Sequence, residues 1–275
     1  INEFFNWRVA FIAVGLPGVV LAIIIRLTMR EPQRGRAEGL VDSGSVPALP
    51  EVVDHLWQRP AYKHFIAGGA LTGLAYLSIL QWMPSFLDRT YGMGSGEIGS
   101  WLAPIIGLGG GVGTLLGGRL VDILSRYDER WYMWLPTITT FFAAPLTLMI
   151  FIVSDAALAL IFLSFSVLLY SIHLGPMASA IQGFSPLRMR GIAVAFSLFI
   201  TNIISLGLGP QLVGIVSDFL GPRFGLDALR WALPSVTVIA LIWSAAHFLA
   251  GAKSFSSDLI SPIKHIGDDV LTENK

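Results

Sequence analysis

The chain has 275 residues, of which 54% are hydrophobic and 13% charged, and its mean hydropathy is +0.68. A soluble domain carries about twice that share of charged residues. The 18 Lys and Arg balance 18 Asp and Glu, so no basic surplus is available to bind nucleic acid. The absence of cysteine excludes disulfides, thiolate metal sites and thiol nucleophiles.

Seven long uncharged windows separate the charged clusters. A helix that crosses the hydrocarbon core of a bilayer needs about 20 mostly apolar residues, and all seven windows meet that need, the first only just. Unbroken apolar runs differ from the short alternating segments of a membrane β-barrel. The sequence therefore predicts an all-α, polytopic protein with seven transmembrane helices in the lipid bilayer. The windows cover residues 9–25, 64–87, 98–118, 131–154, 156–187, 191–217 and 231–252.

The chain begins at Ile1 with neither an initiator Met nor a basic signal-peptide region, so we interpret it as a fragment of a longer protein. After the first window the chain is polar, with Pro32, Pro47 and Pro50, and it cannot bury enough apolar surface to fold alone. The predicted organisation is a first transmembrane helix at 1–28, a cytoplasmic linker at 29–60, a six-helix bundle at 61–252 and a cytoplasmic tail at 253–275.

The positions of Lys and Arg predict the orientation, because short loops rich in these residues stay in the cytoplasm. If the first helix begins outside, all but four of the 18 basic residues fall on the inside. We therefore expect a multi-pass protein of the inner membrane, with its N-terminus outside and its C-terminus in the cytoplasm. The four basic residues left outside are Arg8, Arg89, Arg223 and Arg230.

The third window carries glycines four residues apart, at Gly109, Gly113 and Gly117. On a helix they form one smooth stripe that a neighbouring backbone can approach closely. Plain helix packing is the simpler interpretation. The sharper one is that such contacts let helices rock against each other.

The fifth window places Ser166, Tyr170, His173 and Met177 on one helical face. Burying an unpartnered polar group in a membrane is costly, so these residues are candidates for a solute cavity. The alternative for His173 is a neutral ring satisfied by a nearby hydroxyl. His247 has no polar stripe beneath it, and we expect it to be structural. No Asp, Glu, Lys or Arg lies deep in any window.

The loop after the third window carries a recognisable pattern. Gly118, Leu120, Asp122 and Arg126 match the signature G-x-L-x-D-R-x-G-R, with Ile123 and Ser125 as departures. In this loop and in several other segments the chain resembles the major facilitator superfamily, and specifically its bacterial Spinster-like branch. The other segments are Trp7-Arg8-x-Ala10-Phe11, Gly15-x-Pro17-Gly18, Arg30-Glu31-Pro32, Asp128-x-Arg130-Trp131-Tyr132, Arg188-Met189-Arg190, Gly207-x-Gly209-Pro210, Ser217-Asp218 and Leu229-Arg230.

The resemblance implies the sixth helix, the central loop and the C-terminal six-helix half of a twelve-helix secondary carrier that works by alternating access. Its partners would be the missing N-terminal half and a small, amphipathic or organic-anion solute, with no cofactor, metal or catalytic residue. Gly118, Asp122 and Arg126 would belong to the conformational loop, where Asp122 meets the fifth helix of the other half. The implied cavity walls carry Tyr76, Tyr170, His173 and Asn202.

Other classes of membrane protein are alternatives to a carrier. A seven-helix receptor or photoreceptor has the same helix count, but the windows hold no lysine for retinal and the linker isolates one helix. A membrane enzyme would need a metal-binding or Ser-His pair with supportive spacing, and none is visible in the windows. A channel would need a filter motif or an oligomeric pore.

Overall fold

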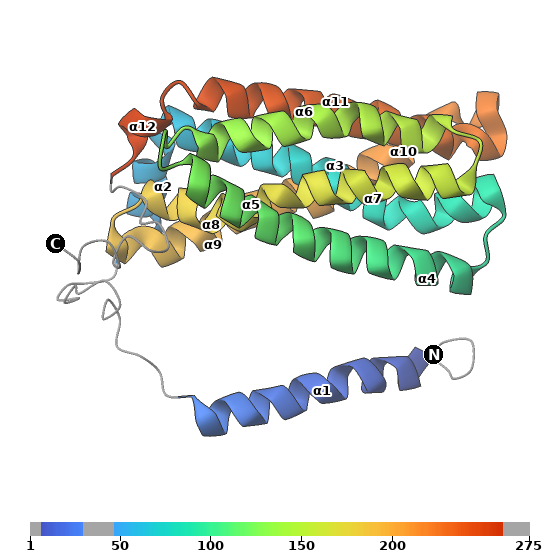
Figure 1. Cartoon of the computed structure of the whole chain (residues 1–275), viewed down its shortest axis with the longest axis horizontal. Coiled ribbons are helices and arrows are strands. Elements are labelled where there is room, and N and C mark those ends of the chain that lie inside the picture. Colours follow the sequence, from blue (N-terminus) through green and yellow to red (C-terminus); the bar gives the residue numbers. More distant parts are fainter. Residues whose placement is uncertain (1–6, 30–46, 261–275) are drawn as a thin grey trace. The chain divides into compact units, whose positions relative to one another are not determined.

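The computed structural model describes residues 7–29 and 47–260, and within these ranges the regular structure is helical throughout (Figure 1). The chain divides into two compact units, Ile1–Ser45 and Val46–Lys275, which are described separately. The predicted all-α class is confirmed. The linker residues 30–46 and the tail residues 261–275 lie outside the described part of the chain.

The first unit contains one helix, α1 (Trp7–Thr28). Its 22 residues correspond to about 33 Å, enough to cross a hydrocarbon core of about 30 Å. Its described apolar side chains, among them Phe11 and Leu16, are exposed, as expected of a helix that faces lipid or another part of a membrane protein.

The second unit is a bundle of long helices with short connections. Two spans are continued through a turn of π-helix, and one through a break at His173. The elements are α2 (Leu49–Trp57), α3 (Pro60–Tyr91), α4 (Ser95–Pro104), η2 (Ile105–Gly109), α5 (Gly110–Leu124), α6 (Trp131–Ile152), α7 (Ala156–Ile172), α8 (Leu174–Gly183), η3 (Leu187–Met189), α9 (Arg190–Asn202), η4 (Ile203–Leu208), α10 (Gly209–Phe224), η5 (Gly225–Asp227), α11 (Ala228–Gly251) and α12 (Phe255–Asp258).

Six long apolar helical stretches lie within the described residues, and they account for seven crossings. The last stretch, Leu187–Gly251, has 65 residues and would measure about 98 Å if it were straight, roughly three bilayer cores. It instead reverses at Gly225, whose φ of +56° lies in the region that favours glycine, and α11 then packs against α10. This count agrees with the seven predicted windows.

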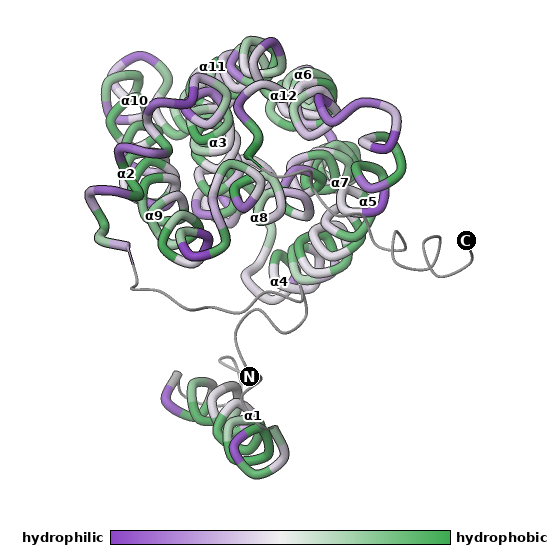
Figure 2. The backbone as a smooth tube through the Cα atoms, turned by 90° about the vertical axis from the view of Figure 1, so that its left-hand side faces the viewer, coloured by the Kyte–Doolittle hydropathy of each residue, from purple (hydrophilic) through white to green (hydrophobic). Residues whose placement is uncertain are grey.

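Helix α3 occupies the centre of the bundle. It packs against α11, α7 and the α9–η4–α10 span, and in Figure 2, where the helices are seen end-on, these elements surround it. Cross-helix hydrogen bonds hold the contact with α11, because Ser244 donates to the Gly68 carbonyl oxygen at 2.7 Å and Thr72 lies 2.7 Å from the Ser244 hydroxyl. Large apolar side chains such as Leu115 and Phe219 remain exposed, as a lipid-facing surface requires.

Helix α2 lies within residues 29–60, which the sequence analysis treated as a linker, and the structure shows that part of this segment is ordered against the bundle. Val52 and Leu56 are fully buried. Nε2 of His55 donates to the Phe184 carbonyl oxygen at 3.1 Å. Burial and the charge of Arg59 lower the pKa of the His55 imidazole, which favours this neutral donor. The polar composition hid an amphipathic helix of nine residues.

Around Phe184 the structure forms an aromatic cluster that we call the α2-end cap. Its rings belong to Tyr62, Phe65, Phe184 and Phe255, and each of the other three lies within 6.5 Å of Phe184, centroid to centroid. The cap is closed by α12, because the Asp258 carboxylate accepts a 2.8 Å hydrogen bond from the Ala61 backbone nitrogen. The start of α3 is thereby tied to the end of the described chain.

We predict that Leu56→Ala lowers the free energy of unfolding by about 2–5 kcal/mol, because it empties a fully buried site in the contact between α2 and the bundle. The matched control is Leu49→Ala on the same helix, whose side chain is 53% exposed. Thermal unfolding of the purified chain in detergent measures both variants. Equal melting temperatures would contradict the docking of α2.

Candidate functional site

The polar stripe predicted on the fifth window lies inside the bundle. Tyr170 is 1% exposed, and its hydroxyl is hydrogen-bonded to the Thr147 hydroxyl of α6. His173 is 6% exposed, and its Nδ1 donates to the Tyr170 carbonyl oxygen at 2.5 Å. Both side chains therefore sit behind the surface of the second unit rather than on it. Met177 is half-buried on α8.

Two of the predicted cavity residues reach the surface. Tyr76 is half-buried on α3, and its ring lies 5.7 Å from that of Tyr170. Asn202 is exposed at the end of α9. The structure thus brings Tyr76 and Tyr170 together and leaves Tyr76 and Asn202 as the polar members that a solute can reach from outside the second unit.

Two spans are interrupted by π-helical turns, which the sequence analysis did not predict. One is η2 between α4 and α5, and the other is η4 between α9 and α10. Single π-turns occur frequently at functional sites. In η4 the Ser205 hydroxyl donates to the Ala70 carbonyl oxygen of α3 at 3.1 Å. The sequence features that could have indicated these turns are the run of glycines in 107–111 and the Gly209-Pro210 pair.

The glycine stripe of the η2–α5 span lies against α7. A methyl group at Gly113 would stand 2.5 Å from the Leu168 carbonyl oxygen, and one at Gly117 would overlap that of Ile172. Gly109 is looser, with the Val167 Cγ1 atom 3.5 Å away. Two of the three glycines therefore allow an approach that no other residue permits.

The contact continues beyond the break in the α7–α8 span. A methyl group at Gly175 of α8 would lie 2.6 Å from the Gly118 nitrogen of α5. Helix α5 therefore meets α7 before His173 and α8 after it, in both cases through backbone atoms. Gly118 thus belongs to the same contact as the α5 stripe, a relationship that its place in the signature loop did not reveal.

Along the chain, the signature loop comes directly after this contact. Asp122 is half-buried on the last turn of α5, and Arg126 is exposed in the turn beyond it. Further along, Asp128 and Arg130 form an ion pair at 2.7 Å. Hydrogen bonds from Arg130 lower the pKa of the Asp128 carboxyl group. The loop is therefore shaped in part by its own charges.

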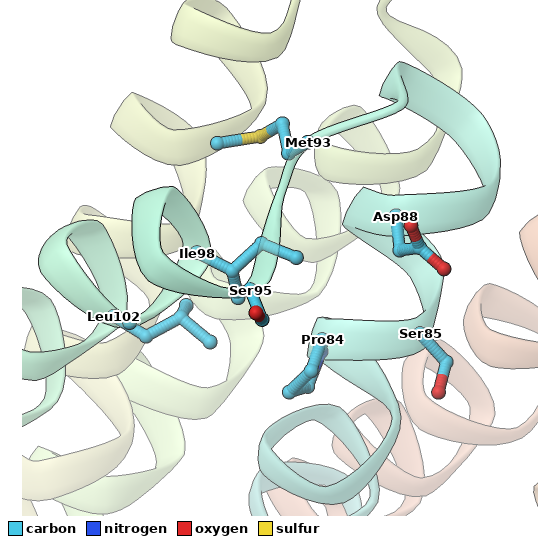
Figure 3. Close-up of a pocket in the computed structure, with 8 residues that line it drawn as sticks. Pro84, Ser85, Asp88, Met93, Ser95, Ile98 and Leu102 are labelled. Atoms are coloured by element: carbon cyan, nitrogen blue, oxygen red, sulfur yellow. The ribbon is translucent and has the colours of Figure 1, made fainter. Parts of the chain in front are cut away.

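At the end of α3 opposite α2, a pocket of about 590 Å³ opens between α3 and α4 (Figure 3). Its floor is apolar, with Met93, Ile98 and Leu102 buried, and its rim carries the Asp88 carboxylate. The sequence alone did not indicate a pocket here, although residues 88–97 form a recognisable Gly-rich connection. The remaining lining residues are Pro84, Ser85, Ser95 and Gly99.

Metal ligation by three or more side chains has no candidate in the described ranges 7–29 and 47–260, where no group of three His, Cys, Asp or Glu converges. The arrangement of the second unit is instead that of a helical bundle with backbone-to-backbone contacts, π-helical turns and a few polar groups. Such features suit movement of helices and non-covalent binding.

Comparison with known proteins gives this arrangement a family. The family profile described as Major Facilitator Superfamily matches residues 1–210. An MFS-type efflux pump of Mycolicibacterium smegmatis (strain ATCC 700084 / mc(2)155) is 33% identical over 263 residues, which are 93% of this chain and 58% of the pump. The probable galactarate/D-glucarate transporter GudP of Bacillus subtilis (strain 168) is 31% identical over 141 residues, 44% of this chain and 30% of that protein.

Solved structures show the same fold. A bacterial homolog to the human lysosomal transporter Spinster, in an inward-facing and unoccupied conformation, has a TM-score of 0.71 at 23% identity, with 93% of this chain and 61% of that chain covered. Its inward-facing and occupied conformation has a TM-score of 0.69 at 22% identity, with 93% and 60% covered. The chain spans less than two thirds of the length of these relatives.

We predict that Gly113→Ala destabilises the bundle by about 1–3 kcal/mol, because the added methyl group overpacks the contact with the Leu168 carbonyl oxygen. Gly111→Ala is the matched control on the same helix, where no heavy atom lies within 4 Å of the added carbon. That control should gain up to about 1 kcal/mol of helix stability. If both variants melted alike, the close contact between α5 and α7 would be refuted.

Proposed function

The chain belongs to the major facilitator superfamily, and we propose that it is the C-terminal part of a secondary carrier that moves a small solute by alternating access. One observation carries this proposal: 93% of the chain superimposes on a transporter of the same overall fold. The close backbone contacts of α5 with α7 and α8 support it, since helices that meet at glycines have fewer side chains to interlock and can shift against each other.

For the solute, we propose an amphipathic molecule. The predicted cavity residues offer a solute two reachable polar groups, the Tyr76 phenol and the Asn202 amide, whereas a sugar would require many hydrogen-bonding side chains. The relative from Mycolicibacterium smegmatis is described as an efflux pump, which fits export of such a molecule. The transporter named for galactarate and D-glucarate favours an organic anion as the second candidate.

We propose different tasks for the four predicted cavity residues. Tyr76 and Asn202 contact the solute. Tyr170 and His173 are positioning residues. The bond of the Tyr170 hydroxyl to Thr147 holds α7 against α6 and keeps the Tyr170 ring beside that of Tyr76. The buried His173 ring is bonded to the Tyr170 carbonyl oxygen and fixes the end of α7. This division revises the interpretation in which all four residues line the cavity walls.

In the signature loop we propose that Asp122 forms a charge-assisted contact with the remaining part of the carrier when the inner side is closed. Asp122 is half-buried at the end of α5, directly after the glycine contact with α8. Movement at that contact would therefore displace the carboxylate. Gly118 would serve as the pivot and Arg126 as part of the same loop.

The proposed location is the inner membrane, with α2 and the signature loop in the cytoplasm. We predict that a reporter fused after Arg36 or after Lys264 reports cytoplasm, because these positions lie in the segments rich in Lys and Arg. A reporter inserted near Gly94, beside the pocket of Figure 3, should report the outside. Opposite signals at two of the three positions would reverse the proposed orientation.

The test of function uses the intact carrier, this chain together with the preceding half, in proteoliposomes. Ethidium serves as the amphipathic probe and D-glucarate as the organic anion. We expect saturable transport of one probe. We also expect Asp122→Asn to shift the inward–outward equilibrium about 10- to 100-fold, since a hydrogen bond to a charged group contributes about 1.5–3 kcal/mol.

The matched control is Asp128→Asn in the same loop, where the carboxylate belongs to an exposed ion pair with Arg130. Such pairs contribute little, so its transport rate should stay within about twofold of that of the unmodified carrier. Equal effects of the two substitutions would remove Asp122 from the gate. Failure to move either probe would count against the proposed solute classes.

A further inference from the structure

Two histidines meet at the α2 end of the bundle, one on the first long helix and one on the last. Nδ1 of His64 on α3 lies 3.0 Å from Nδ1 of His247 on α11. The two ring centroids are 5.2 Å apart and the rings are tilted by 45°. The sequence analysis regarded His247 as structural because its own helix offered no partner. The structure supplies one from 183 residues away in the sequence.

The backbone holds this pair in place. A methyl group at Gly251 of α11 would stand 2.9 Å from the His64 Cβ atom, so the two helices are in close contact beside the rings. Further along the same interface, the hydrogen bonds of Ser244 with Gly68 and Thr72 fix the register of α11 on α3. The two imidazoles therefore face each other, and no rearrangement of the helices is needed to bring them together.

The geometry matches two imidazoles on one metal ion. With metal–nitrogen bonds of about 2.0–2.1 Å, neighbouring ligand nitrogens are about 3.3 Å apart in a tetrahedral site and about 2.8 Å apart in a square-planar one. The observed 3.0 Å lies between these values. Imidazole centroids on a tetrahedral ion would be about 5.2 Å apart, which agrees with the observed 5.2 Å.

The position of the two histidines relative to the membrane favours binding of a hydrated metal ion. Helix α3 has 32 residues, about 48 Å, and exceeds the hydrocarbon core by about 18 Å. His64 is one turn from its start, which places the ring near the headgroup region. Both histidines are half-buried rather than sealed, so water can reach them.

We propose that His64 and His247 form a binding site for a divalent transition-metal ion of the zinc, nickel or copper class, which bridges α3 and α11. Each ring binds through Nδ1 and carries its proton on Nε2, so the hydrogen shared by the pair moves to Nε2 and no oxidation is needed. Water completes the coordination, because within the described ranges no third His, Cys, Asp or Glu joins the pair. The bound ion would lock the two helices together.

The test is copper titration of the 275-residue chain in detergent, without a polyhistidine tag. Electron paramagnetic resonance of the first equivalent of Cu²⁺ should show two nitrogen ligands. His64→Gln and His247→Gln should each leave a single nitrogen and weaken Cu²⁺ binding at least about tenfold, since loss of even an outer-shell partner costs that much. Zn²⁺ should raise the melting temperature of the unmodified chain but not of either variant.

The matched control is His55→Gln, which removes an imidazole that is bonded to the Phe184 carbonyl oxygen instead of to a second histidine. It should keep the two-nitrogen spectrum. Persistence of that spectrum in the double variant His64→Gln/His247→Gln would overturn the proposal, as would binding by the unmodified chain no tighter than by the double variant.

Discussion

The closeness of α5 to α7 and α8 is the constraint on which much of this bundle depends. In a bilayer the lipid tails are as apolar as leucine, so helices gain little from burying apolar side chains against each other. What remains is close van der Waals contact and hydrogen bonding between helices. Gly113, Gly117 and Gly175 provide the close contact, because they place no side chain of their own between the helices.

Hydroxyl groups provide the hydrogen bonds between helices. At the α3–α11 interface Ser244 and Thr72 form a short chain that ends at a backbone carbonyl oxygen. At the α2 end, the Tyr62 hydroxyl lies 2.8 Å from that of Ser197 on α9. These bonds satisfy polar groups that would otherwise be costly in lipid, and they determine which faces of α3 meet which neighbours. Small and polar residues therefore help to specify the interior, together with the large apolar side chains buried there.

The sequence predicted the features that depend on composition and periodicity. Uncharged windows revealed the crossings because the bilayer imposes a minimum length, and four-residue spacing placed Gly113 and Gly117 on one face. It could not predict contacts between distant segments. Three features depend on a helix other than the one that carries the residue. They are the partner of His247, the burial of Tyr170 and the π-turn at Ser205. Helix α2 was missed because nine residues with two buried apolar side chains are too few to stand out in a polar segment.

The α2-end cap has a consequence for biogenesis. The bond between Asp258 and the Ala61 nitrogen joins positions 197 residues apart, so it cannot form until nearly the whole bundle has been synthesised. At about 5–20 residues per second, the ribosome needs roughly 10–40 s to cover that distance. Until Phe255 has been synthesised, Tyr62, and later also Phe184, lack the Phe255 side of their enclosure. The cap therefore closes only after the last long helix of the bundle, α11, has been synthesised.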